Sequence, residues 1–200
     1  MSLQSSSVWI AVLGAGGGGV LYGAFLTWIA GRFLRALPPS SPLPRKVFHL
    51  GIFTGAAPVQ LLFGFWGLVL YGIGISSLVL NALIRGPKGT LYRVLARPKD
   101  GSAERRYILL PLVSTALGGI TSVLLVGSFS VVGFLVCGWG DAVGEPVGTR
   151  WGVHRYPVLS FGSEKRTRSL EGSAAVFLAG FLGGWSALGL LGTPPLSAMG

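Results

Sequence analysis

The segment from residue 141 to residue 172 concentrates the acidic side chains of an otherwise apolar chain. Its sequence, DAVGEPVGTRWGVHRYPVLSFGSEKRTRSLEG, holds four of the six acidic residues and five of the sixteen Lys and Arg. Asp141 and Glu145 stand four positions apart, which on a helix places both carboxylates on one face. Mg²⁺ is typically held by one or two carboxylates, with phosphate oxygens and water completing its shell. The spacing predicts a magnesium site here; the alternative is an interfacial acidic pair neutralised by Arg150 and Arg155.

A basic cluster follows and leads directly into the last apolar segment. Lys165, Arg166 and Arg168 can contact phosphate, and arginine offers a planar bidentate fork for it. Ser169 is expected to cap the next helix, with Glu171 in its first turn, where the helix dipole favours a negative charge or a bound phosphate. The alternative is a cationic membrane flank that ends in a good helix cap.

Three glycines recur at four-residue spacing between these two groups. Gly144, Gly148 and Gly152 surround Arg150. On a continuing helix they would form a smooth packing ridge, whereas in a loop they would let backbone N–H groups approach phosphates. The sequence leaves both structures open.

A third group of polar residues opens the second apolar segment. His49 follows Arg45 by four positions, so both fall on one helical face beside Lys46. A single histidine at a membrane interface is more often structural than catalytic. We therefore treat His49 as a candidate whose role depends on what else lies near it.

The composition identifies an integral membrane protein. Half of the residues are hydrophobic, 11% are charged and the mean hydropathy is +0.66. A helix needs about 20 apolar residues to cross a bilayer. We expect an all-α, polytopic transmembrane bundle of about six helices, forming one domain over residues 1–200 with a catalytic loop region at 138–173. The apolar windows lie at 8–30, 48–64, 66–84, 107–126, 128–144 and 172–191.

The cations support this arrangement and orient it. All sixteen Lys and Arg fall in alternate connections, with four between the first two windows, seven between the third and fourth, and five between the fifth and sixth. The positive-inside rule then places the three basic loops in the cytoplasm and both termini outside. The same cations predict contact with anionic lipid headgroups. Nucleic-acid binding is not expected, because no basic soluble domain is present.

Two familiar nucleotide-binding patterns are excluded. Gly14 to Gly19 satisfies the G-x-G-x-x-G pattern, but the dinucleotide fold also needs a soluble βαβ unit and an acidic residue about 20 positions on. The first acidic residue of the chain is Asp100, so these glycines are interpreted as helix packing. No G-x-x-x-x-G-K-[ST] loop occurs, which excludes a P-loop kinase.

Three islands of sequence resemble the CTP-dependent lipid-alcohol kinases, comprising dolichol kinase, phytol kinase and the CTP-using diacylglycerol kinase. Arg45-Lys46-x-x-His49 is similar to the family's R-K-x-x-H opening, and LYRVLARP at 91–98 resembles its central basic loop. The segment from Asp141 to Ser173 resembles the signature D-A…G-x-x-x-G…K-[ST]-x-E-G-S. Two departures are present. Arg168 replaces the usual lysine, and Glu145 with Pro146 replaces small apolar residues.

This resemblance implies transfer of the γ-phosphoryl group of CTP to the hydroxyl of a phytol, polyprenol, dolichol or diacylglycerol-like lipid alcohol. Asp141, with Glu145 or Glu171, would hold Mg²⁺, and Asp141 or His49 would orient or deprotonate the alcohol. The expected catalytic residues are Asp141, Glu171 and His49. The expected nucleotide-binding residues are Arg45, Lys46, Arg97, Gly148, Arg150, Gly152, Lys165, Arg168, Ser169 and Gly172.

Two other functions stay open at this point. The CDP-diacylglycerol synthases share the D…G…K-x-E-G skeleton, although their K-D-x…H-G-G type C-terminal signature is absent here. A phosphatidate cytidylyltransferase of that kind would release pyrophosphate rather than CDP. The third possibility is a non-catalytic transporter or assembly subunit, whose polar residues should line helix midplanes rather than one face of the membrane.

Overall fold

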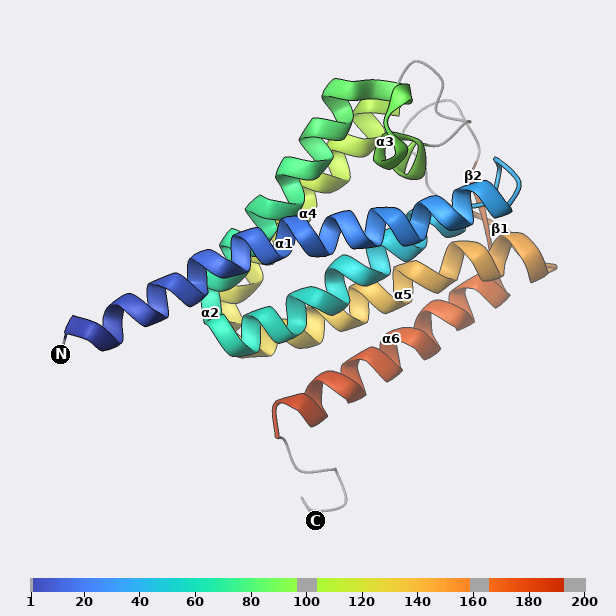
Figure 1. The fold of residues 1–200 in the computed structure, drawn as a ribbon. Coiled ribbons are helices and arrows are strands. Elements are labelled where there is room, and N and C mark those ends of the chain that lie inside the picture. The colour runs from blue at the N-terminus through green and yellow to red at the C-terminus, as the bar shows by residue number, and fades with distance from the viewer. Residues whose placement is uncertain (1, 97–103, 159–165, 193–200) are drawn as a thin grey trace, which may run out of the picture.

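The computed structural model describes residues 2–96, 104–158 and 166–192, and Figure 1 shows a bundle of long helices. Two of the expected nucleotide-binding residues, Arg97 and Lys165, lie outside these ranges. The helices are α1 (Ser2–Ala36), α2 (Leu43–Arg85), α3 (Thr90–Leu95), α4 (Glu104–Val126), α5 (Ser130–Trp151) and α6 (Leu170–Leu190), with short 3-10 turns η1 (Gly86–Lys88) and η3 (Gly127–Phe129).

Among the residues that the structure describes, four stretches are long and apolar enough to cross a membrane, which confirms an integral membrane protein. They are Leu13–Ala36, Leu43–Lys88, Arg105–Trp151 and Leu170–Leu190. The expectation of about six separate helices is met only in part. The two middle stretches contain 46 and 47 residues, so each would measure about 70 Å as a straight helix, more than twice the thickness of a bilayer core of about 30 Å.

Both long stretches are broken at a glycine with a positive φ. Gly64 has φ 61° inside α2, and Gly127 has φ 56° between α4 and α5. Only glycine adopts this region of backbone space without steric strain. The expected windows 48–64 and 66–84 meet at the first break, and the windows 107–126 and 128–144 meet at the second. Figure 1 shows the chain turning back within α2, at the turquoise bend.

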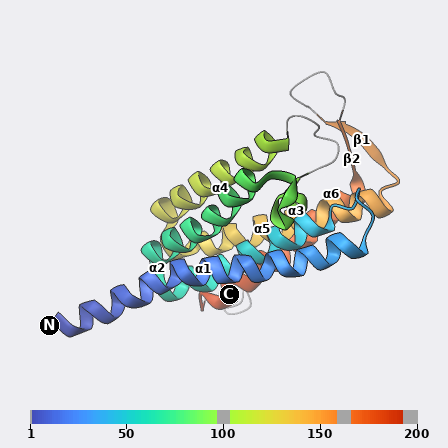
Figure 2. The same ribbon diagram turned by 45° about the horizontal axis from the view of Figure 1, so that its top comes forward.

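The all-α expectation is confirmed, and the structure adds one short element that the sequence did not predict. Strands β1 (Arg155–Val158) and β2 (Arg166–Ser169) form a two-stranded antiparallel hairpin between α5 and α6. Each strand has only four residues, too few for a period-two pattern to stand out among the turn and basic residues around them. Figure 2 shows this hairpin at one end of the bundle, beyond the ends of α5 and α6.

Close packing of the helices depends on small residues. A Cβ added to Gly74 of α2 would lie 2.4 Å from the carbonyl oxygen of Gly16 in α1, and one on Gly19 would lie 2.8 Å from the carbonyl oxygen of Tyr71. In α6, a Cβ on Gly183 would lie 2.6 Å from the carbonyl oxygen of Leu135 in α5. Helix backbones in membranes approach each other through such residues. The contacts agree with interpreting the N-terminal glycines as packing residues.

The buried core joins helices that are far apart in sequence. One cluster unites α1, α2 and α3 around Leu26, Phe48 and Tyr92. Large apolar side chains such as Ile84 and Phe177 stay exposed, as expected of surfaces that face lipid rather than water. The bundle therefore buries a narrow core and leaves an apolar exterior to the bilayer.

We expect Gly74→Val to destabilise the contact between α1 and α2, because the added side chain must displace the Gly16 backbone. Overpacking of this kind costs about 1–3 kcal/mol. Gly72→Val is the matched control, since a Cβ at Gly72 meets no atom within 4 Å. Unfolding midpoints in detergent micelles measure the difference, and equal midpoints for the two variants would contradict the packing described above.

Candidate active site

Opposite charges from α2 and α5 meet in one group, here called the α2–α5 cluster: Arg45, Lys46, His49, Asp141 and Glu145. Lys46 Nζ lies 2.8 Å from Asp141 Oδ2 and 3.5 Å from Glu145 Oε2. Arg45 forms an ion pair with Glu145. His49 Nε2 lies 3.3 Å from Asp141 Oδ2. The expectation that the two carboxylates share one face of a helix is confirmed.

Burial differs between the two sides of this cluster. The Lys46 side chain is only 6% exposed, whereas that of Asp141 is 59% exposed. An ammonium group in such surroundings needs anionic partners, because its burial without them is costly. The basic residues therefore lie deep and the carboxylates lie closer to the surface, where a ligand can reach them.

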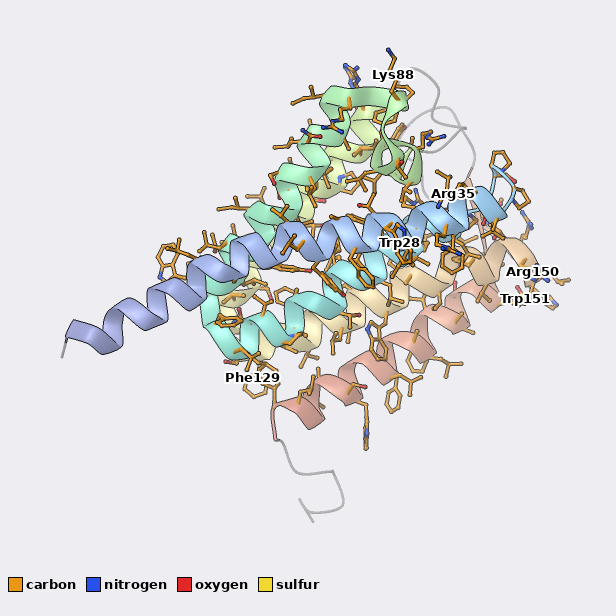
Figure 3. All side chains as sticks on the ribbon, in the orientation of Figure 1. Trp28, Arg35, Lys88, Phe129, Arg150 and Trp151 are labelled. Atoms are coloured by element: carbon orange, nitrogen blue, oxygen red, sulfur yellow. The ribbon has the colours of Figure 1, made fainter. Side chains whose placement is uncertain are left out.

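The cations that neutralise Asp141 and Glu145 are not those that the alternative interpretation of the sequence named. Arg45 and Lys46 neutralise the carboxylates, not Arg150 and Arg155. Arg150 instead lies over the ring of Trp151, with its guanidinium carbon 5.4 Å from the ring centroid. Figure 3 shows both side chains projecting from the end of α5, far from Phe129 at the opposite end of the bundle.

Local packing sets the position of α2 against α5. The side chain of Phe53 occupies the space beside Gly138, where an added Cβ would lie 2.3 Å from the Phe53 Cβ. Trp139 Nε1 donates to Thr54 Oγ1 at 3.0 Å. The ring of His49 packs against Phe53, with centroids 4.6 Å apart. These contacts bring the first turns of α2 to the level of Asp141.

The second half of the expected site lies where the end of α5 meets the start of α6, here called the α5–α6 junction. Ser169 Oγ accepts from the backbone N–H of Gly172 at 3.1 Å, so the expected helix cap is confirmed. Glu171 Oε1 accepts from the backbone N–H of His154 at 3.1 Å and lies 2.7 Å from His154 Nδ1. The hydroxyl of Tyr156 lies 2.7 Å from Ser173 Oγ.

The structure shows Gly144 and Gly148 in a helix rather than in a loop, the two alternatives that the sequence left open. Helix α5 continues to Trp151, so Gly144 and Gly148 form a helical ridge that packs on α6. A Cβ on Gly148 would lie 3.0 Å from Ser169 Oγ, and one on Gly172 would lie 2.9 Å from the Gly144 carbonyl oxygen. Gly152 ends the helix in an extended conformation. A contact of these glycines with nucleotide stays a prediction.

The three carboxylates expected to bind metal divide between these two places. Asp141 and Glu145 lie in the α2–α5 cluster, while the contacts of Glu171 are to His154. Within residues 2–96, 104–158 and 166–192, no three His, Cys, Asp or Glu side chains are grouped to hold a metal ion. Arg168 is exposed on β2, opposite Tyr156. The metal and nucleotide roles of these residues stay predictions.

His154 is a polar contact that the sequence analysis missed. It is one of only two histidines in the chain and lies inside the polar segment, which was the available signal. Its partner is 17 residues away, however, and only the β1–β2 register brings the two together. That register pairs Arg155 with Ser169.

We expect Lys46→Met to reduce stability by about 1–3 kcal/mol, because two carboxylates lose a charged hydrogen-bond donor. The exposed Lys88→Met serves as the control and should be near neutral. Denaturation midpoints in micelles measure both variants. In a double-mutant cycle, the loss should shrink when Asp141→Asn is already present; purely additive effects would contradict the contact.

Comparison with known proteins supports the resemblance seen in these residues. A phytol kinase from Synechocystis sp. is 31% identical over 146 residues, which cover 69% of this chain and 55% of that protein. The chain thus spans about half the length of this curated relative. No protein-family model matches the chain, and no solved structure matches it. The chain is a distant homologue of phytol kinase, a lipid-alcohol kinase.

Proposed function

We propose that this protein is a membrane lipid-alcohol kinase that transfers the γ-phosphoryl group of CTP to the hydroxyl of an isoprenoid or similar lipid alcohol. One observation carries the proposal: in a chain homologous to phytol kinase, a buried lysine and a partly buried arginine of α2 face two more exposed carboxylates of α5. These residues include the Arg45-Lys46-x-x-His49 and Asp141 islands of the lipid-alcohol kinase pattern.

Phosphoryl transfer asks the protein mainly for positioning and for stabilisation of negative charge. Arg45 and Lys46 supply that stabilisation from a largely desolvated position, where a cation interacts more strongly with phosphate than it does in water. In the structure the same two cations form ion pairs with Glu145 and Asp141. Binding of a nucleotide would let them exchange carboxylate partners for phosphate oxygens.

The carboxylate pair fits magnesium. Two carboxylates one helical turn apart, of which Asp141 is 59% exposed, match the one or two protein ligands that Mg²⁺ usually takes when phosphates and water complete its shell. Asp141 and Glu145 would hold the ion. When bound, it would supply positive charge to the phosphate groups, and thereby compensate the carboxylates for losing Arg45 and Lys46.

The proposal assigns His49 to the alcohol. Nε2 faces Asp141 Oδ2 at 3.3 Å, and in the tautomer that carries its proton on Nε2 the ring would have Nδ1 as the acceptor for the proton of an incoming hydroxyl. Packing of the ring on Phe53 fixes its plane. The tail of the alcohol would stay in contact with the apolar helix surfaces that the bundle leaves exposed.

Purified protein incubated with phytol, Mg²⁺ and CTP labelled at either the α or the γ phosphorus tests the proposal. We expect the γ label in the lipid and CDP in solution. We expect Asp141→Asn to lower kcat/KM by about 10²-fold or more, while Lys88→Met leaves it unchanged. Appearance of the α label in the lipid with release of pyrophosphate would instead identify a CDP-lipid synthase. Unchanged turnover of Asp141→Asn would contradict both the kinase and the synthase proposals.

The same proposal includes six membrane crossings, with the three basic connections in the cytoplasm and both termini outside. In a Cys137→Ala background, Ser128→Cys should react with a membrane-impermeant maleimide added to intact cells. Ser40→Cys, in the first basic connection, should react only after permeabilisation. Both positions are exposed in the structure. Equal labelling of the two in intact cells would contradict this topology.

A further inference from the structure

We propose that the exposed face at the C-terminal end of α1 binds one anionic phospholipid of the membrane, with the lipid phosphate between Arg32 and Arg35 and an acyl chain along the apolar residues that precede them. The residues of this face, here called the α1 lipid site, are Leu21, Phe25, Trp28, Arg32 and Arg35. The site shares no residue with the α2–α5 cluster, so it stands independently of the proposed kinase activity.

The five side chains follow one face of α1. Their spacing of four, three, four and three residues keeps them in a narrow stripe along the helix. Leu21, Phe25 and Trp28 are 74%, 53% and 56% exposed, so each leaves more than half of its surface to a ligand. Arg32 and Arg35 continue the stripe and are exposed as well. The stripe is therefore apolar first and cationic at its end, the same order of polarity as in an anionic phospholipid.

The stripe also has the length of one bilayer leaflet. Arg32 and Arg35 lie in the last two turns of Leu13–Ala36, a stretch long and apolar enough to cross a membrane. Residues 21 to 35 cover about 21 Å of helix, and one leaflet with its headgroup layer measures about 20 Å. When the two arginines reach the headgroups, Leu21 thus lies at the depth of the acyl chain ends.

The two arginines have no anionic partner in the described part of the chain. Of the ion pairs between described side chains, none includes Arg32 or Arg35. The guanidinium carbon of Arg32 lies over the ring of Trp28, 5.4 Å from its centroid, and a cation–π contact of this kind uses none of the guanidinium N–H donors. Those donors are left for a phosphate, which arginine can bind through two parallel hydrogen bonds.

Aromatic packing fixes the arginine that lies over Trp28. The rings of Phe25 and Trp28 stack with centroids 6.1 Å apart and an interplanar angle of 20°. Tryptophan is enriched at the level of lipid headgroups, where its ring meets both apolar and polar surroundings. Figure 3 shows Trp28 and Arg35 along α1, with Arg35 nearer the C-terminal end of the helix.

A surface recess of about 780 Å³ lies at the same end of α1. Its lining combines apolar side chains with two cations and is formed by Trp28, Ile29, Arg32, Phe33, Arg35 and Ala36. A lipid alcohol would leave both guanidinium groups without an anion, and a nucleotide would leave the apolar stripe unused. An anionic phospholipid satisfies both halves of the site.

The test measures binding of single lipids to the purified full-length chain in detergent by native mass spectrometry. We expect dioleoyl phosphatidylglycerol to bind more tightly than dioleoyl phosphatidylcholine, whose headgroup carries its own cation. Arg32→Gln combined with Arg35→Gln should weaken the Kd of the first phosphatidylglycerol by about 10-fold or more. Trp28→Leu, which keeps an apolar side chain but removes the cation–π contact, should weaken it by about 2–5-fold.

The matched control is Arg85→Gln combined with Lys88→Gln. It removes two exposed cations that are also three positions apart, so the change in net charge is the same, and it should retain the wild-type Kd. Equal losses in the two double variants would show non-specific attraction to a cationic surface and would overturn the proposal. So would an unchanged Kd in the α1 double variant, or equal wild-type affinity for the two lipids. Unfolding midpoints without added lipid should agree among all variants, because every substituted side chain is exposed.

Discussion

Burial of the Lys46 ammonium, with Arg45 partly buried next to it, is the constraint on which the site depends. Arg45 and Lys46 lie at the start of α2 with little exposure, and a charged group at such a position is tolerated only beside an opposite charge. Asp141 and Glu145 provide that charge from α5. The ion pairs therefore do more than neutralise: they select one position of α2 along α5, because sliding either helix by one turn would leave a buried cation without its carboxylate.

Helix α5 presents a polar surface to α2 and a surface of small residues to α6. The face that carries Asp141 and Glu145 is polar and meets α2, whereas the adjacent face carries Gly140, Gly144 and Gly148 and meets α6. Small residues on the second face let α6 approach closely enough for Ser169 to touch Gly148. The same helix thus holds the charged cluster and places the first turn of α6, with Glu171, at its C-terminal end.

The sequence was sufficient for the features that depend on local patterns. The apolar windows coincide with helical stretches, the four-residue spacing of Asp141 and Glu145 placed both on one face, and Ser169 caps α6. Contacts between side chains of different helices could not be predicted from such local patterns. The contact between Arg45 and Glu145 joins residues 100 positions apart, and nothing local to either residue distinguishes that partner from Arg150.

The structure of the polar connection between α5 and α6 was even harder to predict from the sequence. Its strands are short, and Pro146 with the recurring glycines weakened the evidence for a helix, yet α5 continues to Trp151 because those glycines pack against α6. The partnership of His154 with Glu171 follows only from the hairpin register. Prediction from sequence therefore failed where tertiary packing overrides weak local preference.

The glycine bends within the two long apolar stretches bear on how the chain enters a membrane. The turns at Phe63–Trp66 and Gly127–Phe129 contain no charged side chain, so on the proposed topology neither requires an ion to be carried through hydrocarbon during biosynthesis. Each stretch can insert as a preformed helical hairpin, while its charged ends stay on the side of the membrane from which it inserts. The segregation of cations would then guide insertion first and serve phosphate binding afterwards.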